Sequence, residues 1–304
     1  MNTLFELLIG LLILAVSTCV PVVHAQTQTA VPKIVNGSLP HVSPNGKEIV
    51  FASDRNGTDD LFVLSSDGMT TTQLTHTPEH EAFVAWTDDS KNVLFYVLND
   101  GISTIFKIDL KGQNQQVVTR IPGRSPALSP NGKQLLYASG SWTEMSLFLS
   151  PLSGENPRQI NDGKSIAWNT NWSPSGKRFA FTGRVDSKSE LAVFLANADG
   201  TQVHQVSNVP AEEGAAQWPV WSNDGRWLAV QVGSRVKKNS AHIWLVEVST
   251  GLSRKLASHE EAYLDETPSW FPDGKHLAFQ SNRTGRMEVW VMNVDGTNAK
   301  QLTR

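Results

Sequence analysis

The stretch Pro268-Ser-Trp-Phe-Pro-Asp-Gly-Lys-His-Leu-Ala-Phe-Gln-Ser281, near the end of the chain, decides how the rest is interpreted. Its Pro-Asp-Gly sequence at 272–274 is typical of a turn, because Pro fits the second position and Gly tolerates a positive φ. Residues 277–280 are apolar and short enough for a β-strand. Residues 289–292 and 299–303 are also predicted strands, separated by a tight turn at Asp295-Gly296. This stretch therefore predicts four short strands with turns between them.

The same unit occurs five more times upstream, at spacings of 44, 42, 44, 49 and 49 residues between the Lys or Arg that follows each turn. These cations are Lys47, Lys91, Lys133, Lys177, Arg226 and Lys275. Four strands in a period of this length are typical of a β-propeller blade. We therefore predict an all-β fold over residues 38–304, a six-bladed β-propeller with four antiparallel strands per blade. A stack of β-sandwiches explains the strands but not the single repeat.

Composition narrows the possible partners. The chain has 304 residues, with 26 Lys and Arg against 29 Asp and Glu. This balance gives no electrostatic reason to expect nucleic acid binding, and we expect a monomer with protein partners. Four Trp residues recur at one position of the repeat, which indicates a packing role rather than a platform for sugars; they are Trp86, Trp172, Trp221 and Trp270.

The first residues resemble a secretory signal. Residues 7–16 form an apolar run, and Val23-His24-Ala25 is suited to cleavage, so residues 1–25 are interpreted as a signal peptide and 26–37 as a flexible lead-in. Two alternatives stay open: a membrane anchor over 4–23, and lipidation at Val16-Ser-Thr-Cys19. Cleavage would remove Cys19, the single Cys, and would leave a mature protein without disulfides or a stable membrane span. We expect a periplasmic or secreted protein, while residues 33–35 are a candidate for an extra strand beside the last blade.

One face of the predicted ring is the candidate binding face. Because strands alternate in direction, the loops between blades share a face with the loops between second and third strands, and loops on a rigid scaffold commonly bind partners. The inter-blade loops are acidic, and the other loops carry much of the basic charge. The alternative is a solvated surface without a partner, and Trp142 is either an anchor for a partner or local core. The candidate partner-binding residues are Glu79, His80, Glu81, Trp142, Glu212, Glu213, His259, Glu260 and Glu261.

Catalytic motifs are absent from the sequence. It has no Gly-x-Ser-x-Gly, no His-Glu-x-x-His, no phosphate loop and no dinucleotide fingerprint. We therefore expect no catalytic residues, metal site or cofactor. The alternative is a polysaccharide lyase or hydrolase-related enzyme with a metal-assisted site at the central channel, gathered from several blades without a local motif. Its first candidate residues are Glu79, His80, Glu213 and His259.

The repeat resembles that of a known family. Pro-x-Trp-Ser-Pro-Asp-Gly-Lys, an apolar strand and a Ser-Asp/Asn-Arg-x-Gly loop together resemble the TolB propeller repeat over residues 38–304, most clearly at Phe51-Ala-Ser-Asp-Arg-Asn-Gly57 and Phe279-Gln-Ser-Asn-Arg-Thr-Gly285. The resemblance implies a periplasmic scaffold of the Tol–Pal system, which links the inner membrane to the peptidoglycan-associated lipoprotein at the outer membrane. A departure is that only residues 26–37 stand where TolB has an α/β domain. Peptidase and lyase propellers share the repeat, so we expect a non-enzymatic scaffold that binds a protein such as an envelope lipoprotein, with an enzyme as the alternative.

Overall fold

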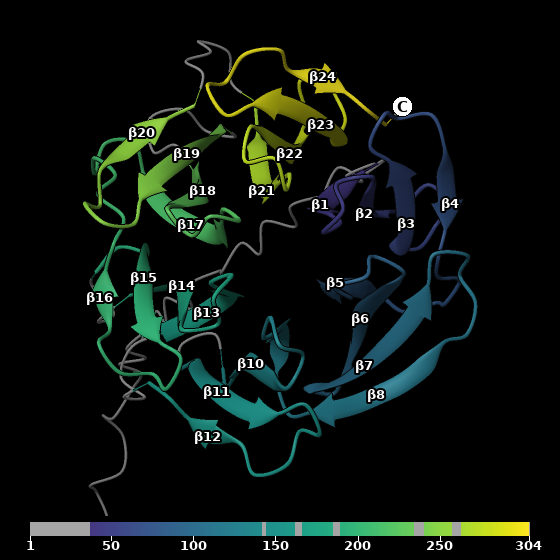
Figure 1. The fold of residues 1–304 in the computed structure, drawn as a ribbon, viewed down its shortest axis with the longest axis horizontal. Helices are drawn as coiled ribbons and strands as arrows, with labels where there is room; N and C mark the ends of the chain where they lie inside the picture. The colour runs from purple at the N-terminus through teal and green to yellow at the C-terminus, as the bar shows by residue number, and fades with distance from the viewer. Residues whose placement is uncertain are drawn as a thin grey trace, which may run out of the picture. The chain divides into compact units, whose positions relative to one another are not determined.

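The predicted six-bladed β-propeller is confirmed. A computed structural model describes residues 37–141, 144–161, 166–184, 189–233, 240–256 and 263–303, all within the unit Ile34–Arg304. They form six four-stranded antiparallel sheets arranged as a ring (Figure 1). Blades 1 to 3 consist of β1 (Ser38–Val42), β2 (Glu48–Ser53), β3 (Asp60–Ser65) and β4 (Thr71–Gln73); β5 (Glu81–Trp86), β6 (Asn92–Asn99), β7 (Ile102–Asp109) and β8 (Gln116–Ile121); and β9 (Arg124–Leu128), β10 (Gln134–Ser139), β11 (Ser146–Pro151) and β12 (Arg158–Gln159).

Blades 4 to 6 consist of β13 (Ile166–Trp172), β14 (Arg178–Arg184), β15 (Ala192–Asn197) and β16 (His204–Gln205); β17 (Ala215–Trp221), β18 (Trp227–Gly233), β19 (Ala241–Glu247) and β20 (Ser253–Lys255); and β21 (Asp265–Trp270), β22 (His276–Ser281), β23 (Glu288–Asn293) and β24 (Lys300–Gln301). Each blade runs in strand order from the channel outward. Within the described residues, no helix is long and apolar enough to cross a membrane.

Local hydrogen bonds explain the turn after each innermost strand. In blade 1 the hydroxyl of Ser43 donates to Asn45 Oδ1 (2.7 Å) and accepts from the Glu48 backbone N–H (3.0 Å). The same Asn45 oxygen accepts the N–H of Lys47 at 2.8 Å, and Gly46 takes a φ of 72°. The turns of blades 3 and 5 repeat these bonds. The turn motif therefore closes mainly through its own side chains, and in blade 1 the Asn45 N–H also donates to Ser90 Oγ of blade 2 at 3.1 Å.

Aromatic pairs join the second and third strands of most blades. Phe51 lies opposite Phe62 in the ladder, and their ring centroids are 5.7 Å apart. Blades 2, 3 and 4 hold equivalent stacked pairs with centroids 5.2, 5.7 and 5.5 Å apart. Such cross-strand pairs stabilise a sheet by more than the area they bury. An aromatic residue of the third strand therefore contributes to the packing of each of these four blades.

All outermost strands except β8 are short, and in blade 1 a Gln–Leu pair fixes the outermost strand. Leu74 donates its N–H to Leu61 O at 2.7 Å, and Gln73 Nε2 donates to Thr75 O at 2.8 Å. The Thr75 hydroxyl oxygen then accepts the Leu61 N–H at 2.8 Å. In the last blade only Lys300–Gln301 is strand, which is shorter than the predicted 299–303. Leu302 still donates its N–H to Val289 O, but the Val289 N–H bonds to the Thr303 hydroxyl instead of a backbone carbonyl.

Packing between blades builds the core and closes the ring. The predicted packing role of the four Trp residues is confirmed, since all four are buried and donate their indole N–H to an innermost-strand carbonyl of the preceding blade. Within the described residues, blade 6 contains only its own four strands, and β1 lies against β21 and β22 (Figure 1). The Val42 N–H donates to Ser269 Oγ at 3.0 Å across this junction. The candidate extra strand at 33–35 and the predicted signal at 1–25 lie outside the described residues.

Candidate functional site

The ring presents two different faces. Innermost strands begin on one face, together with the inter-blade loops and the loops between second and third strands; we call it the loop face. They end on the opposite face, where the Ser-Pro-Asn-Gly-type turns lie; we call it the turn face. This division follows from the antiparallel strand order in all six sheets.

The predicted partner-binding residues are spread around the loop face. The side chain of His80 is 83% exposed, and its Nδ1 lies 3.1 Å from Asp59 Oδ2. Glu79 is half-buried in the same segment, which leads into blade 2. Glu212 is exposed in the segment that leads into blade 5, and Glu213 Oε2 lies 3.3 Å from Lys255 Nζ. Blades 2 and 5 stand on opposite sides of the ring, so the structure does not bring these two groups together. The remaining candidates Trp142, His259, Glu260 and Glu261 lie outside the described residues.

Glu81 differs from its neighbours because it is buried. It begins β5, is only 4% exposed, and its Oε1 is hydrogen bonded by the Thr77 hydroxyl. Burial raises the pKa of Glu81 to about 7, the nearby charge of Asp60 adds to this rise, and the Thr77 bond opposes it. Glu81 is therefore part of a buried polar site rather than of the exposed face.

The innermost strands contain a repeated backbone feature that the sequence did not predict. Five of them place a residue with positive φ three positions before the buried Trp position: Leu39, Ser125, Asn169, Trp218 and Thr267. The pairing register shifts at these places. A polar side chain of the preceding blade accepts the N–H of three of them, from Leu39 to Gln280 Oε1 (2.9 Å), from Trp218 to Thr182 Oγ1 (3.0 Å) and from Thr267 to Gln231 Oε1 (3.4 Å). Trp218 is held in this way with 39% of its surface exposed.

A cavity of about 420 Å³ opens at the turn-face end of the channel, lined by the ends of all six innermost strands. His41 stacks on Phe83 there, with ring centroids 4.0 Å apart and an angle of 16° between the planes. Burial lowers the pKa of His41 to about 4, so its imidazole is neutral at pH 7. The cavity therefore has a mixed polar and apolar lining, with one hydrogen-bond donor and one acceptor from this ring.

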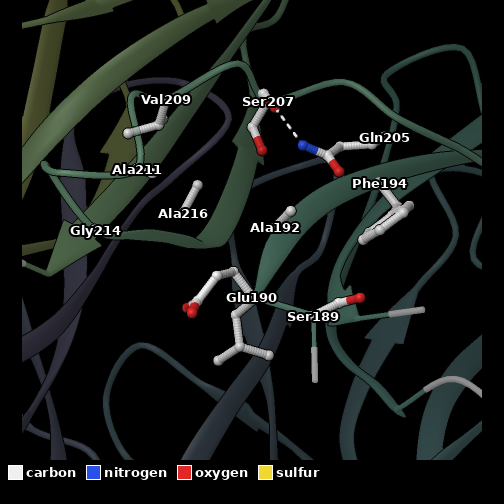
Figure 2. Close-up of a pocket in the computed structure, with 11 residues that line it drawn as sticks. Ser189, Glu190, Ala192, Phe194, Gln205, Ser207, Val209, Ala211, Gly214 and Ala216 are labelled. Carbon is white, nitrogen blue, oxygen red and sulfur yellow. Dashed lines mark hydrogen bonds between the residues drawn. The ribbon is translucent and has the colours of Figure 1, made fainter. Parts of the chain in front are cut away.

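A smaller pocket of about 200 Å³ lies between blades 4 and 5 (Figure 2). Ala192 and Ala216 line it from β15 and β17, while Gln205 Nε2 donates to Ser207 O at 2.9 Å beside it. Counted from the third-strand aromatic and the innermost-strand Trp, these alanines stand where Asp60 and Glu81 stand between blades 1 and 2. The equivalent positions therefore leave a pocket between blades 4 and 5 and hold two carboxylates between blades 1 and 2.

Metal-ligand side chains do not cluster in the described part of the chain. It holds no group of three or more His, Cys, Asp or Glu side chains arranged to bind a metal. Of the residues predicted for the enzyme alternative, Glu79 and His80 lie across the ring from Glu213. A single site cannot include all three in this arrangement.

Six four-stranded blades around a channel define a β-propeller. The TolB beta propeller domain family matches residues 22–149 and 139–304, and the chain belongs to that family. The chain is 27% identical over 206 residues to an uncharacterized protein of Agrobacterium fabrum, covering 66% of each. It is 31% identical over 260 residues to dipeptidyl-peptidase 5 of Porphyromonas endodontalis, covering 79% of this chain but only 36% of that relative.

Solved structures share the fold at low identity. TolB from Acinetobacter baumannii aligns with a TM-score of 0.65 at 18% identity, over 87% of this chain and 62% of the other. Oligogalacturonate lyase in complex with manganese aligns with a TM-score of 0.58 at 13% identity, over 83% and 87% of the two chains. TolB and a lyase thus share this fold, and function has to be argued from the residues of this chain.

Proposed function

We propose that this chain is an exported TolB-like propeller that acts as a monomeric, non-enzymatic scaffold and binds a protein of the cell envelope at its loop face. Membership of the TolB propeller family supports an envelope role. The observation that carries the proposal is Trp218, a large aromatic with 39% of its surface exposed on an innermost strand. It lies three residues nearer the loop face than the buried Trp221.

The chemistry of Trp218 suits an anchor for a protein partner. Trp provides a large, rigid contact area and is enriched among residues that dominate protein interfaces. The hydrogen bond from its backbone N–H to Thr182 fixes the main chain before any partner arrives, which lowers the entropy cost of binding. Glu79, Glu212 and Glu213 place negative charge on the same face. The partner segment is therefore expected to combine an apolar side chain with basic residues.

A pull-down from solubilised envelope extract, analysed by mass spectrometry, tests this function. The wild-type chain is expected to capture a peptidoglycan-associated lipoprotein or another Tol component. Trp218→Ala should weaken capture about tenfold or more, as expected for an interface anchor. Met69→Ala is the matched control, because Met69 is 82% exposed in a turn on the opposite face.

Each other outcome contradicts the proposal. Equal capture by both variants would exclude Trp218 as the anchor, and failure to capture any envelope component would remove the scaffold function. Turnover of a defined substrate that a loop-face substitution abolishes would make the protein an enzyme instead.

A further inference from the structure

Two buried carboxylates lie near each other at the junction of blades 1 and 2, where the charge of Asp60 acts on Glu81. Asp60 begins β3 and is 2% exposed, while Glu81 begins β5. Asp60 Oδ2 accepts from the Thr58 hydroxyl (3.1 Å) and from Gln73 Nε2 (3.0 Å), and Glu81 Oε1 is bonded by Thr77. The second oxygens, Asp60 Oδ1 and Glu81 Oε2, are buried and have no hydrogen-bond partner among the described residues. Buried polar atoms are rarely left unpaired, so these two require an explanation.

The last blade shows how this fold neutralises acids at the equivalent positions. Asp265 begins β21, as Glu81 begins β5, and its Oδ2 lies 2.5 Å from Arg283 Nη2. Arg283 stands two residues beyond Ser281, which pairs with Asp265 in the ladder. In blade 2, Glu81 pairs with Val97 in the same way. The residue two positions beyond Val97 is the exposed Asn99 rather than an arginine.

Asp60, the other acid at this junction, also lacks the arginine that lies near its counterpart in blade 6. Glu288 is the counterpart of Asp60, two residues before the third-strand aromatic. Its Oε1 lies 3.8 Å from Arg286 Nη2, and its charge also acts on Arg55 of blade 1. Two residues before Asp60 the chain has Thr58 instead. Both carboxylates between blades 1 and 2 therefore keep the acidic group of the repeat and lack the cation that accompanies it in blade 6. A buried charge without a counter-charge is strongly unfavourable.

We propose that the junction of Asp60 and Glu81 binds a divalent cation, Ca²⁺, which joins blade 1 to blade 2. Ca²⁺ takes six to eight oxygen ligands from carboxylates, carbonyls and water in flexible geometry, so two carboxylates with water satisfy its charge and chemistry. The side chains that bond the two acids here, Thr58, Gln73 and Thr77, contain no His or Cys ligand, which favours Ca²⁺ over Zn²⁺. The ion would supply the positive charge that Arg283 gives to Asp265 on one side of blade 6 and that Arg286 gives to Glu288 on the other.

Calcium titration of the purified, EDTA-treated chain tests the site. Isothermal calorimetry with CaCl₂ is expected to show one ion per chain, and the melting temperature should rise by about 5 °C at a hundredfold excess over Kd. The double variant Asp60→Asn with Glu81→Gln should lose both responses. Asn99→Arg should lose most of the calcium response without removing an acid, because a guanidinium on that strand face is within reach of Glu81.

Asp265→Asn is the matched control, a buried acid at the same strand position but already paired with an arginine. It should lower the melting temperature and keep the calcium-induced rise. The proposal is overturned if CaCl₂ produces neither heat nor a melting shift in the wild type. It is also overturned if the double variant responds to calcium as the wild type does. Should the double variant fail to fold, the result for Asn99→Arg decides.

Discussion

The indole nitrogen of Trp86 donates a 3.0 Å hydrogen bond to the backbone carbonyl oxygen of His41, so a side chain of blade 2 is fixed to the innermost strand of blade 1. Blades 4, 5 and 6 repeat this bond at 3.2, 3.2 and 3.1 Å. A single blade cannot bury its sheet faces alone, so these contacts between neighbours determine whether the ring holds together.

Trp86→Phe is expected to lower the free energy of unfolding by about 1–2 kcal/mol. The aromatic packing is largely kept, but the His41 carbonyl oxygen loses its donor inside the interface. Urea unfolding followed by tryptophan-independent far-UV circular dichroism measures the change. Trp218→Phe is the control, since the exposed ring should give a change within about 0.5 kcal/mol. Equal losses in the two variants would show that the interblade bond contributes nothing.

The buried pair of Asp265 and Arg283 should matter more than the only partly buried pair of Glu213 and Lys255. Arg283 also lies over the rings of Phe279 and Trp290, 5.2 and 5.4 Å from their centroids. Arg283→Ala is expected to cost about 3–5 kcal/mol, because it leaves a buried carboxylate without a counter-charge, whereas Lys255→Ala should cost less than about 1 kcal/mol. A double-mutant cycle with Asp265→Asn measures the coupling, and a coupling near zero would contradict this account.

The features that sequence predicts well are those encoded within one blade. The turn around Asn45 closes through its own side chains, and the Phe51–Phe62 pair is set by the hairpin register. Six copies of these local signals were enough to predict the propeller and the packing role of its Trp residues. The prediction of an exposed binding face was wrong for Glu81, which stands in an acidic run of the sequence but is buried. Since β5 begins at Glu81, its carboxyl turns into the blade junction while His80 stays in solvent.

The left-handed residues of the innermost strands could not be predicted from sequence. Their types differ, from Leu39 to Thr267, and none is the glycine that usually marks a positive φ. The conformation coincides with acceptors on the preceding blade, and Gln280, which receives the N–H of Leu39, is 241 residues away in the chain. No local pattern carries such a signal, and so Trp218 was missed as a candidate anchor.

The free energy of unfolding is expected to fall on acidification, because His41 is harder to protonate in the folded protein than in the unfolded chain. Its ordinary pKa of 6.5 drops to about 4 in the folded protein because burial disfavours the imidazolium. The folded pKa is the lower one, so the contribution is complete above pH 6.5 and is lost as the pH falls toward 4. Because the side chain is only half-buried, we expect the loss to be about 1–2 kcal/mol.

Comparison with His41→Gln isolates this effect. Asp88 lines the same cavity, and acids elsewhere also gain protons at low pH, but both proteins share these groups. Hydrogen bonds in the turns hold the pKa values of Asp89 and Asp224 below their usual range, so their contribution is lost mostly at lower pH. Urea unfolding at pH 7 and pH 4.5 should show a smaller drop for the variant, and equal drops would exclude His41 as the cause.

Thr267→Gly is expected to stabilise the protein, although glycine normally destabilises a strand. Thr267 has a φ of 48°, where a β-branched side chain is strained by about 1–3 kcal/mol. Its Oγ1 is also buried without a hydrogen-bond partner in the described structure. Glycine removes both costs and keeps the bond from the backbone N–H to Gln231, while the added freedom of the unfolded chain costs about 1 kcal/mol. A net gain of about 1 kcal/mol in urea unfolding should follow. Ala216→Gly, at a regular position of β17, should instead lose about 1 kcal/mol. If both variants lose stability equally, the left-handed residues are not strained, and the bulges of the innermost strands cost the fold nothing.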